Sequence, residues 1–149
     1  MTMRFDHFVI AVHDLAEATA DYRALGFNVV DGGAHADGKS RNVLIAFQDG
    51  AYLEIIAFTE PLAGTTHRWA RALEQGEGMV TYALHVDDLA GAAARLQERG
   101  LAFAAPSDGG RLRPDGQRVV WRSARPASEA ETPLPFLIED ISDRALRVP

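Results

Sequence analysis

The sequence contains an internal repeat, in which residues 5–26 align with residues 79–100 without a gap. Each copy has a strand-like apolar run, an Asp-Leu pair that begins an alanine-rich amphipathic segment, and a closing glycine. Self-similarity at a fixed offset indicates that one supersecondary unit occurs twice. The repeat therefore predicts two modules that each begin with a strand followed by a helix. The alternative is a chance similarity between two unrelated strand–helix units.

Strands are predicted by runs of β-branched and aromatic residues, and helix ends by capping residues. In the first half we predict strands over residues 5–12, 27–30, 41–47 and 51–58, with a helix between Asp14 and Gly26. In the second half we predict strands over residues 79–86, 101–105, 117–123 and 135–141, with a helix between Asp88 and Gly100. A short helix over residues 66–76 connects the halves, and the Gly-, Pro- and Ser-rich residues 106–116 and 124–133 predict loops.

These elements predict one α+β domain over residues 1–149, which is long enough to bury its own core. Module one covers residues 4–59, the connecting helix residues 66–76, and module two residues 79–142. Each module has the order strand, helix, strand, strand, strand.

The composition argues against several classes of protein. A net charge of −6 and a pI near 5.3 do not suit a surface that binds nucleic acid or an anionic membrane. The absence of cysteine removes disulfides and thiolate metal sites, and it fits a reducing compartment. No segment approaches the roughly 20 apolar residues that span a bilayer, and the N-terminus predicts a strand and not a signal peptide. We therefore expect a cytoplasmic protein.

Several motifs resemble those of the vicinal oxygen chelate superfamily, which includes glyoxalase I, extradiol dioxygenases, and fosfomycin- and bleomycin-resistance proteins. The motifs are Asp6-His7 with the following apolar run and Asp14-Leu15, Tyr52-Leu53-Glu54, the spaced set His35, Gly38 and Asn42, the turn Asp49-Gly50, and the segment Pro135 to Glu139. The last four are similar to the branch of glyoxalase-like domains. The resemblance implies two βαβββ modules that form a cupped mixed sheet, with helices on the convex face, a small-molecule pocket in the concave face, and a homodimer.

In metal-dependent relatives, each module supplies one ligand from its first strand and one from its last. The resemblance places His7 and Glu54 at these positions in module one. Module two departs from the pattern, because Thr81 aligns with His7 and either Leu137 or Glu139 falls opposite Glu54. The resemblance thus implies a site of His7, Glu54 and Glu139 for Zn²⁺, Fe²⁺, Mn²⁺ or Ni²⁺.

The surroundings of Glu54 and His7 indicate a chemical role for both. Glu54 lies in an apolar run, so its carboxylate needs a metal, a His, an Arg or a ligand as compensation unless the position faces solvent. His7 shares a strand face with Val9, where a satisfied core histidine is the alternative. As a pair, His7 and Glu54 suit metal binding or removal of a proton next to a carbonyl group.

Other residues are candidates for binding a substrate. His35 and Asn42 are expected to line the mouth of the pocket, and Tyr52, Trp121 and Phe136 to contact the ligand, although core packing is the more frequent use of such rings. Arginines cluster in the second half, where one could meet a carboxylate or a phosphate: Arg111, Arg113, Arg122 and Arg125.

Two main functions remain open at this point. The first is a metal-dependent lyase, isomerase or dioxygenase that acts on a substrate with vicinal oxygens. The second is a metal-free binding or drug-resistance protein that sequesters a small aromatic or amphipathic compound, which Thr81 in place of a ligand favours. A regulatory or scaffold part of a longer protein is a third possibility.

Overall fold

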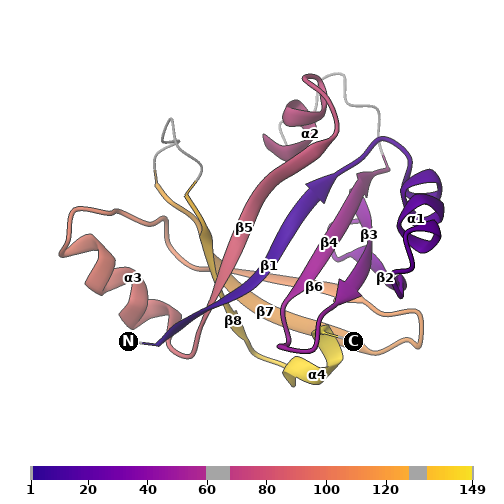
Figure 1. Cartoon of the computed structure of the whole chain (residues 1–149). Helices are drawn as coiled ribbons and strands as arrows, with labels where there is room; N and C mark the ends of the chain where they lie inside the picture. Colours follow the sequence, from indigo (N-terminus) through magenta and orange to yellow (C-terminus); the bar gives the residue numbers. More distant parts are fainter. Residues whose placement is uncertain (1, 60–67, 128–133, 149) are drawn as a thin grey trace.

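The computed structural model describes residues 2–59, 68–127 and 134–148. Two modules follow one another in the same order of elements (Figure 1). Module one contains β1 (Met3–Ala11), α1 (Leu15–Ala24), β2 (Val30–His35), β3 (Ser40–Ala46) and β4 (Tyr52–Phe58); α2 (Arg68–Leu73) follows; module two contains β5 (Gly78–Val86), α3 (Leu89–Gln97), β6 (Ser107–Leu112), β7 (Arg118–Ala124) and β8 (Phe136–Asp140), with α4 (Arg144–Arg147) after it. The predicted α+β fold of two βαβββ modules is confirmed.

The strands close into a barrel in the order β1, β4, β3, β2, β6, β7, β8 and β5. Within each module the first and last strands pair in parallel, as β1 with β4 and β5 with β8. The modules join along two antiparallel seams, β1 with β5 and β2 with β6. The mixed sheet thus curves further than the expected cup and encloses an interior that both modules line.

The two long helices cover the outside of the barrel, on opposite sides in Figure 1. Side chains of α1 pack against a cluster formed by β3 and β4, and Leu89 and Ala92 of α3 pack against Ala124 and Leu137. Both helices begin at a capping aspartate, as the repeat predicts. Asp14 accepts bonds from two backbone amides of α1, and Asp88 accepts one from Gly91.

The second strand of each module lies further along the chain than the sequence predicts. β2 covers residues 30–35 instead of 27–30, and β6 covers residues 107–112 instead of 101–105, where Phe103 forms only an isolated bridge. Both strands contain an Asp-Gly-Gly sequence, which normally indicates a turn and conceals a strand. The part of β6 expected as a loop therefore belongs to the barrel, and His35 ends a strand.

Register shifts interrupt the strands next to the interior. The register of β1 against β5 shifts between Phe5 and His7 and again between Val9 and Ile10, and that of β2 against β3 shifts between Asp31 and Gly33. A bulge adds one unpaired residue and changes where neighbouring side chains point. Because of the first bulge, Asp6 and His7 are both buried although they are adjacent on a strand.

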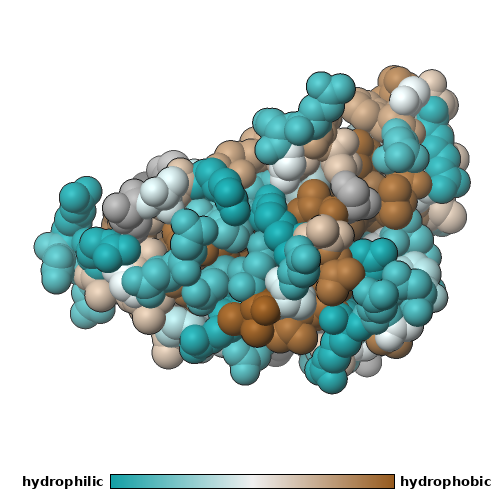
Figure 2. Space-filling view, turned by 90° about the horizontal axis from the view of Figure 1, so that it is seen from below, coloured by the Kyte–Doolittle hydropathy of each residue, from teal (hydrophilic) through white to brown (hydrophobic). Residues whose placement is uncertain are grey.

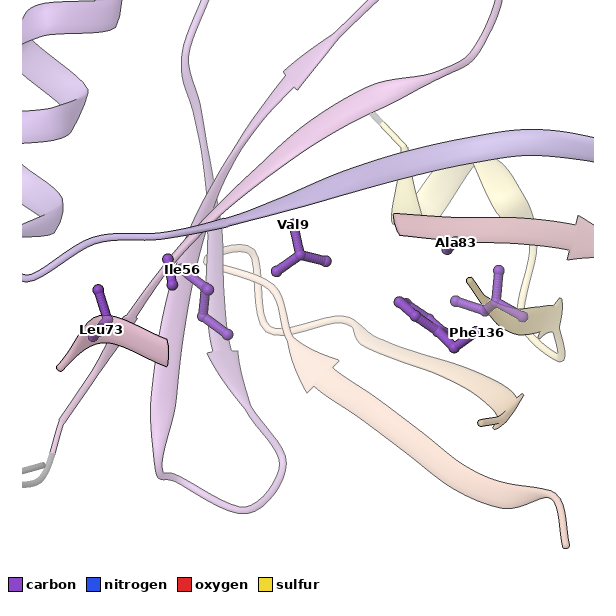
Figure 3. Close-up of a cluster of buried hydrophobic side chains, with 7 residues drawn as sticks. Val9, Ile56, Leu73, Ala83 and Phe136 are labelled. Atoms are coloured by element: carbon purple, nitrogen blue, oxygen red, sulfur yellow. The ribbon is translucent and has the colours of Figure 1, made fainter. Parts of the chain in front are cut away.

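One end of the barrel is filled by an apolar cluster that includes Val9, Ile56, Leu73, Ala83 and Phe136. Figure 3 shows that these side chains come from β1, β4, α2, β5 and β8, so α2 packs over the join between the modules. The connecting helix was predicted over residues 66–76, of which residues 66–67 lie outside the described part.

The surface seen from below the barrel is mostly hydrophilic and carries separate hydrophobic areas (Figure 2). The large hydrophobic side chains that are exposed on the molecule include Phe5, Leu25, Phe47, Met79 and Ile141. Among the described helices, none combines the length and the apolar character needed to cross a membrane.

Candidate functional site

A cavity of about 270 Å³ occupies the interior of the barrel. Alternate residues of the strands line it, as expected from a period of two: Ser40, Asn42 and Leu44 on β3, Tyr52, Glu54 and Ile56 on β4, Trp121 and Ser123 on β7, and Phe136 and Ile138 on β8. His7, His35, Arg111, Arg125 and Arg147 complete much of the wall. The cavity thus brings together side chains from both modules.

Glu54 is held inside this cavity by three neighbouring side chains. Its Oε2 lies 3.3 Å from His7 Nε2, and its Oε1 lies 3.3 Å from His35 Nε2. The side-chain amide of Asn42 donates to Oε1 at 2.6 Å, and Ser40 Oγ lies 2.9 Å from His35 Nδ1. Because Glu54, His7 and Asn42 are buried, the carboxylate is stabilised by these donors in place of bulk water.

Behind His7 lies a second carboxylate, Asp6, which is completely buried. His7 Nδ1 donates to Asp6 Oδ1 at 2.6 Å. Arg147 donates to both oxygens of Asp6, at 2.8 and 2.9 Å, and to the hydroxyl of Tyr52 at 2.7 Å. Arg144 donates to Asp6 Oδ2 at 2.5 Å. The orientation of His7 is therefore fixed by the carboxylate of Asp6, whose negative charge is balanced by Arg144 and Arg147 of α4.

This arrangement favours an imidazolium between two carboxylates. Burial alone would lower the pKa of His7, but hydrogen bonds with Asp6 and Glu54 and their negative charges outweigh it and raise the pKa. Burial would raise the pKa of Glu54, but hydrogen bonds from His35 and His7 hold it well below its ordinary range. Burial also opposes ionisation of Asp6, and hydrogen bonds from Arg147 and His7 still lower its pKa.

Arg111 enters the cavity wall from β6 and is buried. Its Nη1 donates to the carbonyl of Gly32 at 2.7 Å, and its Nη2 donates to the carbonyl of Arg147 at 2.6 Å. Gly32 leaves room for this contact, since a Cβ there would lie 3.0 Å from Arg111 Nη1 and 2.1 Å from Asn42 Oδ1. Asn42 Oδ1 is buried and accepts no hydrogen bond among the described residues.

Aromatic rings form the less polar part of the wall. The His7 ring stacks on Tyr52, with centroids 4.4 Å apart and an interplanar angle of 19°. Phe136 packs edge-on against His7 at 5.5 Å and lies 6.2 Å from Trp69 of α2. The structure places Trp121 in the same wall, with its indole Nε1 over the unsubstituted Cα of Gly109. The cavity can therefore accept a partly apolar ligand.

Module two has no carboxylate at the position equivalent to Glu54. In module one, Glu54 is the register partner of Val9 on β1. The overlay of the repeats places Ala83 on Val9, and the register partner of Ala83 on β8 is Phe136. An aromatic ring thus occupies the place where the metal-binding pattern has a ligand.

The structure does not bring Glu139 to the cavity. On β8 the cavity is lined by Phe136 and Ile138, so Leu137 and Glu139 point to the other face of the strand. Leu137 packs in the cluster beneath α3. The prediction that Glu139 completes a site with the residues of module one therefore has no geometric support, because the register of β8 differs from the two registers expected from the sequence.

The donor atoms do not fit the metal centre that the resemblance implies. His7 and Glu54 are at the expected positions of module one, but the equivalents in module two are Thr81 and Phe136. His35 adds a second imidazole, but it contacts Oε1 of Glu54, whereas His7 contacts Oε2. The two imidazoles therefore do not point at one common position. Within residues 2–59, 68–127 and 134–148, no group of three or more His, Asp or Glu side chains is placed to hold a metal ion.

Two residues of the site, Asp6 and Arg147, have no role predicted from the sequence, and Arg111 is named there only as one of four arginines that could meet a carboxylate or a phosphate. Asp6 was read as a polar strand residue, because the bulge that turns it inward has no evident sequence signal. Arg147 lies in a four-residue helix that periodicity does not reveal. Arg111 was placed in a loop, although the matching Asp-Gly-Gly sequences of residues 31–33 and 108–110 could have identified β6 as the counterpart of β2.

Two βαβββ modules that enclose one cavity define a protein of the vicinal oxygen chelate fold. The chain belongs to the family of glyoxalase-like domains, whose family model matches residues 5–147. The resemblance seen in the sequence is thus confirmed. A comparison with functionally curated proteins gives no match.

Solved structures with the same fold include enzymes and proteins of undescribed activity. Methylmalonyl-CoA epimerase from Mycobacterium tuberculosis is 25% identical with a TM-score of 0.70, over 95% of this chain and 90% of that chain. The Streptomyces coelicolor methylmalonyl-CoA epimerase in complex with 2-nitronate-propionyl-CoA is 23% identical with a TM-score of 0.64, over 93% and 98%. A hypothetical protein from Staphylococcus aureus is 19% identical with a TM-score of 0.77, over 98% of this chain and 62% of that chain. The present chain thus spans less than two thirds of that last relative.

Proposed function

We propose that this protein is an isomerase-type enzyme that moves a proton at a carbon atom next to a carbonyl group of a small substrate. Glu54 accepts the proton, and His7 donates a hydrogen bond to the carbonyl oxygen. The observation that carries the proposal is the buried pair of His7 Nε2 and Glu54 Oε2, 3.3 Å apart in the wall of a cavity.

The distance between the two groups favours insertion of a substrate. Charge-assisted N–H···O bonds are typically about 2.7–2.9 Å long. The contacts of Glu54 with His7 and His35 are longer, whereas His7 is tightly bound to Asp6 at 2.6 Å. A carbonyl oxygen can therefore replace Glu54 as the acceptor for His7 Nε2, while Asp6 keeps the imidazole in place.

This replacement also makes Glu54 a better base. Hydrogen bonds from His35 and His7 lower the pKa of Glu54 against the effect of burial. When His7 binds the substrate, Glu54 loses one of these bonds and its pKa rises, because burial then opposes its charge with less compensation. The carboxylate is thus most basic once a substrate is bound.

The reaction is a balanced transfer of one proton. The C–H bond breaks, its proton moves to Glu54, and its electron pair passes into the carbonyl group, whose oxygen is stabilised by His7. Return of the proton from Glu54 to the same face of the same carbon restores the substrate and is seen only as hydrogen exchange, whereas its delivery to an adjacent atom, or to the opposite face after the planar intermediate turns, completes an isomerisation. The epimerases among the structural relatives support this reaction class.

Hydrogen exchange in D₂O tests the proposal. The protein is incubated with methylmalonyl-CoA and with a panel of small 2-oxo acids and 2-hydroxy ketones, and loss of the C–H signal is followed by NMR. We expect exchange with at least one compound, and a loss of at least about 100-fold in Glu54→Gln and His7→Gln, the range typical of general acid–base groups. Glu139→Gln is the matched control, because Glu139 faces away from the cavity and should leave exchange unchanged. Absence of exchange in the whole panel would contradict the proposal, as would full activity in Glu54→Gln.

The aromatic rings of the wall favour a second candidate function. Tyr52, Trp121 and Phe136 would suit a metal-free protein that binds or sequesters a small aromatic or amphipathic compound. Ligand-induced stabilisation without exchange, and without a bound metal, would support this function.

The metal-dependent lyase or dioxygenase expected from the resemblance would need metal-ligating side chains in addition to those of the described residues. We also propose that the protein is cytoplasmic and forms a homodimer. Light scattering with size-exclusion chromatography tests the dimer.

A further inference from the structure

Arg111 is a buried cation in the cavity wall that forms no ion pair with a carboxylate of the described residues. Its side chain donates to two backbone carbonyl groups, of Gly32 and Arg147, and no described carboxylate forms an ion pair with it. A guanidinium has five N–H donors, and these two bonds leave others available. The negative charge of Glu54 acts on Arg111 without direct contact, so the buried guanidinium is only partly compensated, which favours the binding of an anion beside it.

The charges around the cavity support the same conclusion. The enclosed ionic cluster contains three carboxylates, of Asp6, Glu54 and Asp140. It also contains three guanidinium groups, of Arg111, Arg144 and Arg147, and the imidazole of His7 between Asp6 and Glu54. The guanidinium groups thus balance the carboxylates, and the raised pKa of His7 favours one positive charge in excess.

A second arginine at the cavity, Arg125, is exposed, so water screens its charge as it screens those of the nearby carboxylates. Arg125 lines the cavity over the ring of Trp69, at 5.7 Å from the centroid, and forms no ion pair with the described residues. Asp37 and Asp108 lie at the mouth of the cavity and are exposed, so water screens their charges. Asp108 is also 3.5 Å from Arg122.

We infer that Arg111 binds a carboxylate group of the substrate, which makes the substrate class a small carbonyl compound that is also a carboxylic acid. This inference rests on the proposed function and deepens it. The planar fork of a guanidinium matches the two oxygens of a carboxylate.

The position of Arg111 suits this role. In the barrel Arg111 is the register partner of His35, which contacts Glu54. A carboxylate at Arg111 therefore places the rest of a small molecule beside Glu54 and His7. The cavity volume of about 270 Å³ is near the lower end of the usual range of about 300–1,000 Å³ for ligand sites, so the part of the substrate held inside is compact. Burial lowers the pKa of Arg111, and a bound anion would oppose this effect.

Binding of an acid and its ester tests the inference. The probes are phenylpyruvate, pyruvate and their methyl esters, measured by isothermal titration calorimetry on the wild-type protein without turnover. We expect at least one acid to bind at least tenfold more tightly than its ester. In Arg111→Gln the acid should lose at least tenfold in affinity, while the ester should change less than twofold.

Arg113→Gln is the matched control. Arg113 lies two residues away, donates to the carbonyl of Leu146 in α4 at 2.6 Å, and does not line the cavity. If Arg111 serves only to tie α4 to the barrel, both variants should lose stability and keep the acid preference, which would overturn the inference. Equal binding of acid and ester by the wild type, or binding of neither, would overturn it as well.

A further variant covers a failure of Arg111→Gln to fold. Arg111→Lys keeps the positive charge but loses the fork, so we expect a folded variant with a reduced or lost acid preference and unchanged ester binding. An acid preference equal to that of the wild type in folded Arg111→Lys would overturn the assignment. These measurements do not depend on catalysis. Acid binding without hydrogen exchange would therefore contradict the proposed reaction and leave the carboxylate site standing.

Discussion

Arg147 and Asp6 are 141 residues apart in the sequence and form a two-pronged ion pair inside the protein. Asp6 is completely buried and Arg147 almost so. Arg147 also bonds Asp140 and the hydroxyl of Tyr52. The contact therefore joins β1, β4, β8 and α4 behind the imidazole of His7.

Replacement of Arg147 should destabilise the protein strongly. Arg147→Gln leaves the carboxylate of Asp6 buried with only Arg144 and the imidazole of His7 as partners, and removal of one partner from a buried ion pair typically costs about 3–5 kcal/mol. Urea unfolding measures this loss. Arg113→Gln serves as the control, because Arg113 is more exposed and pairs with the exposed Asp115, so it should cost less than about 1 kcal/mol. Similar losses in the two variants would contradict a special role for Arg147.

The stability of the protein should depend on pH through His7 and Glu54. The folded-state pKa of His7 is raised above 6.5, so its stabilisation is fully present below that value and is lost as the pH rises through the folded pKa. The folded-state pKa of Glu54 is lowered below 4.5, so its stabilisation is present above that value and is lost as the pH falls through the folded pKa. The free energy of unfolding should therefore be highest between pH 4.5 and pH 6.5, the ordinary pKa values of Glu54 and His7.

Urea unfolding from about pH 4 to about pH 9 measures this profile. In His7→Gln the decline on the alkaline side should disappear, because the residue that releases its proton is gone. A variant whose alkaline decline equals that of the wild type would show that another group causes it.

Substitution of Gly32 should disturb the site more than substitution of its counterpart Gly109. In Gly32→Ala the new Cβ would lie 2.1 Å from Asn42 Oδ1, and Asn42 is buried and bonded to Glu54. We expect the free energy of unfolding to fall by about 1–3 kcal/mol, as for an overpacked core. The exchange of the substrate C–H hydrogen in D₂O should also become slower.

In Gly109→Ala the Cβ would lie 2.3 Å from Trp121 Nε1. Trp121 is only partly buried and can move towards the cavity, so this variant should lose less stability and show altered tryptophan fluorescence. Greater destabilisation by Gly109→Ala than by Gly32→Ala would contradict this ranking.

Purified protein without a histidine tag should bind divalent ions weakly. Catalytic metal sites usually have three converging protein ligands. In module one, His7 and His35 contact different oxygens of Glu54 and do not converge on one point, and module two has Thr81 and Phe136 at the equivalent positions. We expect less than half-occupancy by elemental analysis after incubation with Zn²⁺, Mn²⁺, Fe²⁺ or Ni²⁺. Full occupancy that is lost in His7→Ala and Glu54→Ala would instead support a metal-dependent reaction.

The repeat and the capping aspartates are local features, so the sequence predicts the order of the modules and the starts of both long helices. The sequence does not predict the strands that contain Asp-Gly-Gly, because glycine in isolation favours turns. In the barrel, these positions need the small size of glycine because neighbouring atoms lie close to its Cα. His7, Glu54, His35 and Asn42 were selected from motifs, and the structure brings them together. Glu139 was selected with them, but a one-residue difference in strand register turns it outward. Asp6 and Arg147 depend on a bulge and on a contact between distant segments, which no local pattern encodes.

The pairing of Asp6 with Arg147 also constrains the order of events during protein synthesis. Until residue 147 has left the ribosome, β1 cannot enter the barrel without burying a carboxylate that lacks its main counter-charge. The nascent chain should therefore keep its first strand hydrated and the interior unfinished, and the imidazole of His7 should acquire its final setting only after translation has passed α4.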